Sequence, residues 1–455
     1  MKESHVKWAV VGGGISGIAA AYFLRERGVN AEIIEKDATL GGRIGSGRIG
    51  PRSIDFGGKN IGRHYKLFRD FSRSLGDYTY EPFGINSSRV RNGKIVTLDS
   101  SRRFRSTFNF LRDCPKRDVL LLAYLCAHVL INKNNRYLGS RFFSALGERH
   151  DKTPLDMIFS RHFCNAAVRP MSVRMNGAEP DEIYLGNFGT NIGMWLDSYD
   201  QLQSGMSTLL DAFQHTARLL LGTRVDQLLM QNNRIAGLRL SHADGTTEER
   251  EYDNVILATP ACVTADLVRH VDASLADALS RIKYYPVMVA IAEYQRDIFS
   301  PEVRALVFGP QDPLSNAGAY GVTCRNIVRY TFSGRAARAM IEEGISPECF
   351  IELGETTLNR YIPVKANERR AFVSRLFDPG LCAYGPYHAR ILDAIDHASR
   401  SICNLFITGD YIRGASIEAC MQASKATVTR GAAVLPTDAR SNPSASTCEP
   451  RASTY

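Results

Sequence analysis

The stretch that decides the fold is residues 6–35, VKWAVVGGGISGIAAAYFLRERGVNAEIIE. Its first six residues, Val6 to Val11, are mostly apolar and predict a buried strand of a parallel sheet. A glycine turn follows, and residues 18–27 then predict a helix that ends at Gly28. Residues 31–34 predict a second strand, which ends at Glu35. Strand, glycine turn, helix, strand and acid together predict a βαβ unit that binds a dinucleotide.

The glycine turn supplies what a pyrophosphate needs from a protein backbone. Gly12 permits the tight turn, Gly14 lets the pyrophosphate approach the chain, and Gly17 lets helix and strand pack closely. The first N–H groups of the helix are free, and they carry the positive end of the helix dipole. A βαβ turn without a ligand is the alternative for this motif taken alone. The contacts predicted for the turn are Gly12, Gly14, Ile15, Ser16 and Gly17.

Glu35 narrows the choice of dinucleotide. It lies 18 residues after Gly17, where a carboxylate can accept hydrogen bonds from the adenosine ribose. An acid at this position argues against the 2′-phosphate of NADP. The fingerprint alone does not separate NAD from FAD.

Four further motifs follow in the chain: Gly41-Gly42-Arg43, Asp55-Phe56-Gly57-Gly58, Gly222-Thr223-Arg224-Val225, and Gly409-Asp410 with Ile417-Glu418. With the βαβ unit, their order resembles the FAD-dependent amine oxidase superfamily, which includes protoporphyrinogen oxidases and phytoene-type desaturases. The resemblance implies FAD as the cofactor. It also implies contacts to FAD from Gly42, Arg43, Gly57, Gly58, Val225, Gly409, Asp410 and Ile417. Arg43 could be a solvated loop charge, but its place after two glycines in a phosphate-binding domain favours a contact to the flavin or the pyrophosphate.

The resemblance implies an α/β fold with a discontinuous, Rossmann-like FAD-binding domain and an α+β substrate domain. From the motif positions we expect the FAD-binding domain to comprise residues 5–75, 204–268 and 398–435. The substrate domain should comprise residues 76–203 and 269–397. Residues 436–455, rich in Ser, Pro, Thr and Ala, are expected to be a disordered tail.

Two local predictions are specific enough to check. Asn92-Gly93 between alternating segments predicts a hairpin turn. Residues 209–221 have apolar positions at helical spacing, with Ser207 as a plausible cap and Gly222 as the stop.

The expected activity is FAD-dependent dehydrogenation of a specialised small molecule, because flavin N5 accepts a hydride while the protein supplies orientation. Monoamine-oxidase-like members carry a lysine and a cage tyrosine where this chain has Val289 and Ser416. These departures favour a protoporphyrinogen-oxidase-like or desaturase-like reaction on an apolar or acid-bearing substrate. Amine or amino-acid oxidation is the alternative, and a non-redox flavoprotein isomerase is an alternative of another class. The catalytic side chains and the electron acceptor stay open, with O2 one candidate acceptor.

Composition excludes several classes of function. The chain has 455 residues, 23% of them charged, and a net charge of +9, which suits an anionic cofactor or substrate. No basic cluster with interleaved aromatic residues indicates nucleic-acid binding, and no spacing of ligands indicates a metal site. The polar N-terminal residues lack a secretory signal pattern, so a cytoplasmic location is expected. Cys382 is interpreted as a buried structural thiol rather than a point of flavin attachment.

A basic stretch precedes the longest apolar run. Residues 102–117 contain five arginines and lysines beside Arg102, and Val119 to Ile131 follow directly. We interpret these segments as a solvated loop and a buried helix. The alternative is a peripheral membrane patch, or an entrance for an apolar, acidic substrate.

Overall fold

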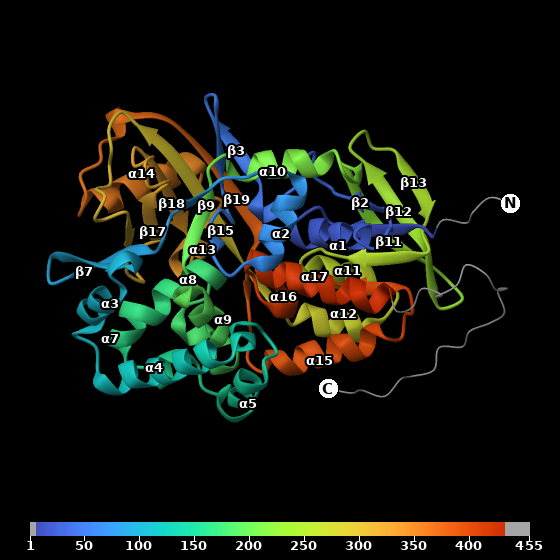
Figure 1. The fold of residues 1–455 in the computed structure, drawn as a ribbon, viewed down its shortest axis with the longest axis horizontal. Coiled ribbons are helices and arrows are strands. Elements are labelled where there is room, and N and C mark those ends of the chain that lie inside the picture. Colours follow the sequence, from blue (N-terminus) through green and yellow to red (C-terminus); the bar gives the residue numbers. More distant parts are fainter. Residues whose placement is uncertain (1–5, 433–455) are drawn as a thin grey trace.

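The computed structural model describes residues 6–432, and the predicted tail at 436–455 lies outside the described residues (Figure 1). A five-stranded parallel sheet has the order β10-β2-β1-β14-β20. Its strands come from distant parts of the chain: β1 (Trp8–Val11), β2 (Ala31–Ile34), β10 (Arg218–Leu220), β14 (Asn254–Leu257) and β20 (Leu405–Ile407). The predicted α/β fold with a Rossmann-like parallel sheet is confirmed. The domain boundaries stay a prediction.

Helices cover this sheet because its strands are apolar on both faces. All four residues of β1 and of β14 are buried, as expected for a parallel sheet between helical layers. Helix α1 (Ile15–Arg25) packs against α17 (Ile417–Ala432), so the two ends of the described chain lie side by side (Figure 1). The start of α17 is thereby brought close to the glycine turn.

A second sheet has seven strands in the order β19-β15-β18-β17-β16-β7-β8. One face packs its apolar side chains against α13 and α14. The other face turns Val287, Val289 and Ile291 toward Ile49, Ile54 and Phe56 of the hairpin β3–β4. Its strands and covering helices are β7 (Asn86–Arg91), β8 (Lys94–Asp99), β15 (Lys283–Tyr294), β16 (Ala305–Val307), β17 (Leu314–Ala319), β18 (Ile327–Phe332), β19 (Arg369–Ala383), α13 (Arg335–Glu342) and α14 (Pro347–Asn359).

A group of helices forms the lower left of Figure 1, around a core of its own. It comprises α3 (Arg103–Leu111), α4 (Lys116–Ile131), α5 (Arg141–His150), α6 (Leu155–Ile158), α7 (Arg161–Phe163), α8 (Arg169–Asn176) and α9 (Leu185–Leu196). Within residues 6–432, none of the helices has the length and apolar character needed to cross a membrane.

The remaining elements connect these three bodies. The strands are β3 (Ser46–Ile49), β4 (Arg52–Asp55), β5 (Ile61–Gly62), β6 (Tyr80–Pro82), β9 (Tyr199–Leu202), β11 (Thr223–Gln231), β12 (Arg234–His242) and β13 (Thr247–Glu251). The helices are α2 (Lys66–Leu75), α10 (Gly205–Gln214), α11 (Ala261–Val268), α12 (Ala273–Ser280), α15 (His388–Ser399) and α16 (Asp410–Arg413).

Of the two local predictions, the hairpin is confirmed and the helix is partly wrong. The hairpin at Asn92-Gly93 is confirmed, with φ of 49° and 72° at the two turn residues. The helix over 209–221 is wrong in its second half, because α10 ends at Gln214 and β10 pairs in parallel with β2. Burial in the sheet overrides the helical spacing there.

The basic stretch is also different from its prediction. Helix α3 occupies Arg103–Leu111, where a loop was expected. The apolar run is helical as predicted, but α4 is only partly buried: Leu120, Tyr124, Leu130 and Ile131 are exposed. The inner faces of α3 and α4 contribute to the same apolar core, and both helices leave apolar residues on their outer faces.

Candidate cofactor and substrate site

The glycine turn forms an open cradle at the start of α1. Gly12 has φ of 103°, which favours glycine. A Cβ at Gly17 would lie 1.8 Å from the Gly12 carbonyl oxygen, so only glycine lets α1 approach β1 this closely. A Cβ at Gly14 would meet no heavy atom within 4 Å, and no side chain caps the helix there. The free N–H groups of α1 therefore face open space.

Glu35 and the segment that contains Val225 lie together beside this cradle. The Glu35 carboxylate accepts hydrogen bonds from the backbone N–H groups of Gly13 (2.5 Å) and Asp37 (2.9 Å). The Thr223 N–H donates to the Glu35 carbonyl oxygen at 2.9 Å. Val225, two residues on, is buried on β11. The end of β2 and the start of β11 thus lie where an adenosine would follow a pyrophosphate held at Gly14.

Arg43 joins two of the predicted motifs. Its Nη1 donates to Asp410 Oδ2 at 2.7 Å and to the Gly380 carbonyl oxygen at 3.1 Å. The Tyr284 hydroxyl donates to the other Asp410 oxygen at 2.7 Å. Arg43 is therefore a paired, half-buried charge beside Gly409-Asp410, and the alternative of a merely solvated loop charge is wrong.

Gly57 and Gly58 pack against both of these segments. A Cβ at Gly57 would lie 2.1 Å from the Arg43 carbonyl oxygen. A Cβ at Gly58 would lie 3.5 Å from Ile417 Cδ1, at the start of α17. The residues 42–43, 57–58, 409–410 and 417 therefore surround one region of the molecule, although they are far apart in the sequence.

These observations fit a bound FAD. The open space before Gly14 and the free N–H groups of α1 suit a pyrophosphate. The buried carboxylate of Glu35 suits a ribose, and the region around Arg43 and Ile417 suits the flavin end. The individual contacts to FAD stay a prediction.

In the structure, Val289 is a buried aliphatic residue and Ser416 caps a helix. Val289 is buried on β15, in the face that packs on the hairpin β3–β4. Ser416 Oγ accepts from the Ala419 N–H at 3.1 Å and so caps α17. Ser416 also lines a cavity together with Tyr65, Met175, Asn176 and Tyr384.

Sequence reasoning missed a set of interior cations near this face. Arg329 lies opposite Ile291 and Arg375 lies opposite Val289, so both belong to the face that contains Val289. Lys59 follows Gly58 directly and is buried. Burial and the charge of Arg329 lower the pKa of Lys59 to about 7. The apolar strand 327–332, IVRYTF, contains a single arginine. This arginine is the feature of the sequence from which a charged face could have been predicted.

Cys382 matches its interpretation as a structural thiol. It is fully buried on β19, and burial raises the pKa of its thiol well above the usual value. The thiol is thus protonated and unreactive at neutral pH.

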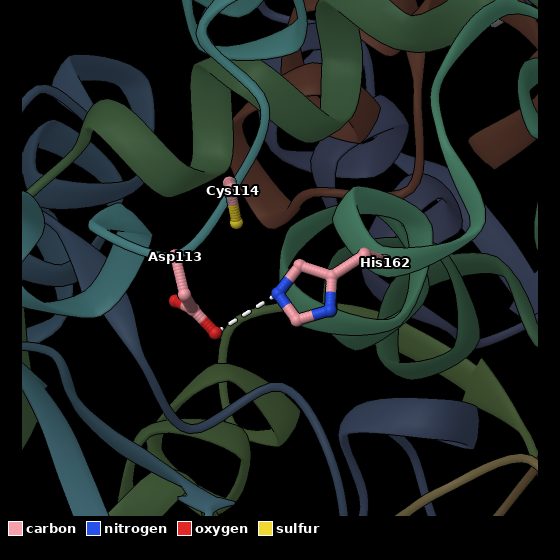
Figure 2. A group of neighbouring side chains, drawn as sticks. All are labelled: Asp113, Cys114 and His162. Atoms are coloured by element: carbon pink, nitrogen blue, oxygen red, sulfur yellow. Dashed lines mark hydrogen bonds and ion pairs between the residues drawn. The ribbon is translucent and has the colours of Figure 1, made fainter.

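One cluster of ligand-type side chains lies away from this region. Figure 2 shows Asp113, Cys114 and His162, with His162 Nε2 2.9 Å from the Asp113 carboxylate. That carboxylate is also paired with Arg89 and Arg91, at 2.6 and 3.3 Å. Burial raises the pKa of Cys114 to about 11, so its thiol keeps its proton. The cluster is an ion-pair network that joins β7 to the helices, and it has no property that favours a metal.

Known proteins share both the fold and parts of the sequence. Mitochondrial protoporphyrinogen oxidase from Nicotiana tabacum is 23% identical, over 90% of this chain and 91% of its own. Flavin-containing amine oxidase B from Sus scrofa is 26% identical, over 37% of this chain and 38% of its own. Cyclohexylamine oxidase from Brevibacterium oxydans has a structure with a TM-score of 0.71 at 15% identity, covering 94% of this chain and 98% of its own.

The model of the family described as flavin containing amine oxidoreductase matches residues 15–430, which is most of the chain. The match confirms the predictions of an oxidoreductase and of FAD as the cofactor. It spans helix α1, the seven-stranded sheet and most of α17. The chain therefore belongs to the flavin-containing amine oxidoreductase family.

Proposed function

We propose that the chain dehydrogenates a small molecule that is apolar or bears an acid, in a protoporphyrinogen-oxidase-like or desaturase-like reaction. The observation that carries this proposal is the charge of the interior face beside the hairpin β3–β4. Val287, Val289 and Ile291 are aliphatic there. The charged neighbours are Arg329, which has no ion pair with the described residues, and Arg375, which is paired with Asp37 at 3.6 Å. Such a face repels a small ammonium substrate and favours an apolar or anionic one.

We propose that the backbone of the glycine turn holds the pyrophosphate of FAD, that Glu35 holds the ribose, and that Val225 lies beside the adenine. The flavin end is held by residues of three segments: Gly42 and Arg43, Gly57 and Gly58, and Gly409, Asp410 and Ile417. When bound, FAD supplies a two-electron acceptor that takes a hydride at N5. The Arg43–Asp410 pair, locked by Tyr284, fixes the segment around Gly409.

Product analysis tests the reaction class. The purified holoenzyme is incubated with a panel of candidate acids and apolar metabolites, and the masses of the products are measured by mass spectrometry. A product two hydrogens lighter than its substrate, with one equivalent of acceptor reduced, supports dehydrogenation. A product of unchanged mass would instead support the isomerase alternative.

Amine or amino-acid oxidation is the second candidate. The structural likeness to cyclohexylamine oxidase and the partial likeness to amine oxidase B favour it. The aliphatic residue at 289 and the cations around it weigh against small amines. A cytoplasmic location and the domain boundaries given above stay predictions.

We further propose that the outer faces of α3 and α4 bind an anionic lipid surface. Phe104, Phe108 and Ile131 are 93%, 70% and 83% exposed. Exposure of such large apolar side chains to water is unfavourable and indicates a surface that a partner covers. A largely apolar groove of about 480 Å³ lies between the two helices, below Phe104 and Phe108. The exposed basic residues around it are Arg102, Arg105, Arg112, Lys116, Arg117 and Lys133.

The charges favour a membrane over an apolar protein partner, because each basic residue near an anionic surface contributes about 1 kcal/mol. Co-sedimentation with phosphatidylserine vesicles tests this surface, with phosphatidylcholine vesicles alongside. The double variant Phe104→Ser/Phe108→Ser should lose at least tenfold in binding, whereas Tyr361→Ser, an exposed aromatic elsewhere, should lose none. Equal binding of both variants, or none by the parent protein, contradicts the proposal.

A further inference from the structure

Three cations lack anionic partners: Lys59 is buried, Arg329 is half-buried and Arg174 is exposed. Arg174 on α8, Arg329 on β18 and Lys59 after β4 form no ion pair with the residues that the structure describes. Arg329 Nε is buried without a hydrogen-bond partner. Lys59 donates to the backbone carbonyl of Tyr320 and lies over aromatic rings, including that of Tyr320. Buried polar and charged groups are normally paired, so the Lys59 ammonium and the Arg329 Nε are groups that an anionic ligand could satisfy.

The charge of Arg329 is close enough to those of Arg174 and Lys59 for repulsion. Burial and the charge of Arg174 lower the pKa of Arg329 to about 10. Burial and the charge of Arg329 likewise lower the pKa of Lys59. The nearby carboxylate of Asp55 is already engaged, because it accepts from Ser46 Oγ at 2.6 Å and from the Met206 N–H at 3.2 Å. The single negative charge of Asp55 therefore reduces the net positive charge of the three cations but does not neutralise it.

Two of the cations lie on elements that border the proposed flavin and substrate region. Arg329 shares its sheet face with Val289 and Ile291. Arg174 is exposed on α8. The next residues on α8, Met175 and Asn176, line the cavity that Ser416 also lines.

We propose that Arg174 and Arg329, assisted by Lys59, bind a carboxylate group of the substrate and thereby orient it toward the flavin. This assignment rests on the proposed function and names the substrate class: a molecule with a carboxylate at one end and the oxidised C–H bond at the other. Guanidinium groups suit the task because their planar donors match a carboxylate. The pyrophosphate of FAD is not the expected partner, because the free N–H groups of α1 form a separate anion cradle at Gly14.

Perturbation of the visible spectrum of bound flavin measures this binding without requiring turnover. The holoenzyme is titrated with benzoate and with indole-3-acetate, and with the uncharged matches benzamide and indole-3-acetamide. We expect each acid to bind the parent protein at least tenfold more tightly than its amide. In Arg329→Gln the two should bind alike, and Arg329→Lys should restore part of the preference. The control Arg239→Gln, at a surface pair with Glu249, should keep the full preference.

Thermal unfolding separates binding from a structural role. Arg329→Gln removes one of several like charges, so its unliganded midpoint should equal or exceed that of the parent protein. Acids that bind no better than their amides overturn the assignment, as does an Arg329→Gln variant that keeps the full preference for acids. Loss of FAD from folded Arg329→Gln also overturns it, because the cations would then serve the cofactor. A parent protein that retains no FAD contradicts the proposed function itself, which distinguishes the two failures.

Discussion

A substitution at Gly14 can test the proposed pyrophosphate site with little effect on the stability of the fold. Its backbone is extended, with φ of −73° and ψ of 179°, which a branched residue adopts readily. A Cβ there would meet no heavy atom within 4 Å. Gly14→Val therefore places two methyl groups in open space before α1, without a clash in the protein. In the proposed site, that space belongs to the pyrophosphate.

The expected loss of FAD affinity follows from the contacts that the methyl groups displace. A hydrogen bond from a backbone N–H to a charged phosphate contributes about 1.5–3 kcal/mol. Losing two of them costs about 3–6 kcal/mol, which corresponds to roughly 10²- to 10⁴-fold in the dissociation constant. The fold should lose only about 0.5–2 kcal/mol, the range for an unfavourable residue at a helix N-cap.

The assay combines FAD content with folding. FAD is counted per protein after gel filtration, the dissociation constant is measured by reconstituting the apoprotein, and the apoprotein's thermal midpoint is recorded. Gly309→Val is the matched control, because Gly309 is exposed and its Cβ would also meet nothing within 4 Å. Full FAD content in folded Gly14→Val would refute the placement of the pyrophosphate.

Two further predictions concern buried side chains. The pKa of Lys59 is lowered to about 7, so the unfolded chain binds more protons than the folded one between pH 7 and about 10, and stability should rise with pH across that window. Lys59→Met should therefore be more stable than the parent protein at pH 6, by up to about 5 kcal/mol at about 1.36 kcal/mol per pKa unit, as measured by thermal unfolding. The gap should narrow above pH 7, to about 2 kcal/mol at pH 9, and close only above the ordinary lysine pKa of 10.5; a gap that is constant with pH would contradict the buried charge. Cys382→Ala should release FAD on acid precipitation as completely as the parent protein does, because the Cys382 thiol is buried and protonated; flavin that stays with the parent protein but leaves the variant would show a covalent bond.

The sequence predicts the parallel sheet and its turn well, because the physical requirements there are local. The turn at Gly12 to Gly17, the strand before it and Glu35 after it are set by spacing alone. The hairpin at Asn92-Gly93 is equally local, since both residues take positive φ. These features need no knowledge of what lies opposite them.

Features that depend on distant partners were not predictable. Residues 218–220 have a helical pattern but form β10, because β2 offers a parallel partner. Helix α4 has an apolar sequence typical of burial, yet no described element covers Leu130 or Ile131. The cation cluster joins a helix, a strand and a loop that are far apart in the chain, so spacing gives no sign of it.

The measurement that tests the central claim most directly is anaerobic reduction of the bound flavin in a stopped-flow instrument. Benzylamine, tyramine and putrescine are compared with carboxylate-bearing and apolar candidates from the product screen. We expect the three amines to leave the flavin oxidised, because the charges of Arg329 and Lys59 repel a cation and position 289 is aliphatic. A carboxylate-bearing or apolar substrate should bleach the flavin. Rapid bleaching by any of the three amines would contradict the proposed dehydrogenation of an apolar or acid-bearing substrate and establish amine oxidation instead.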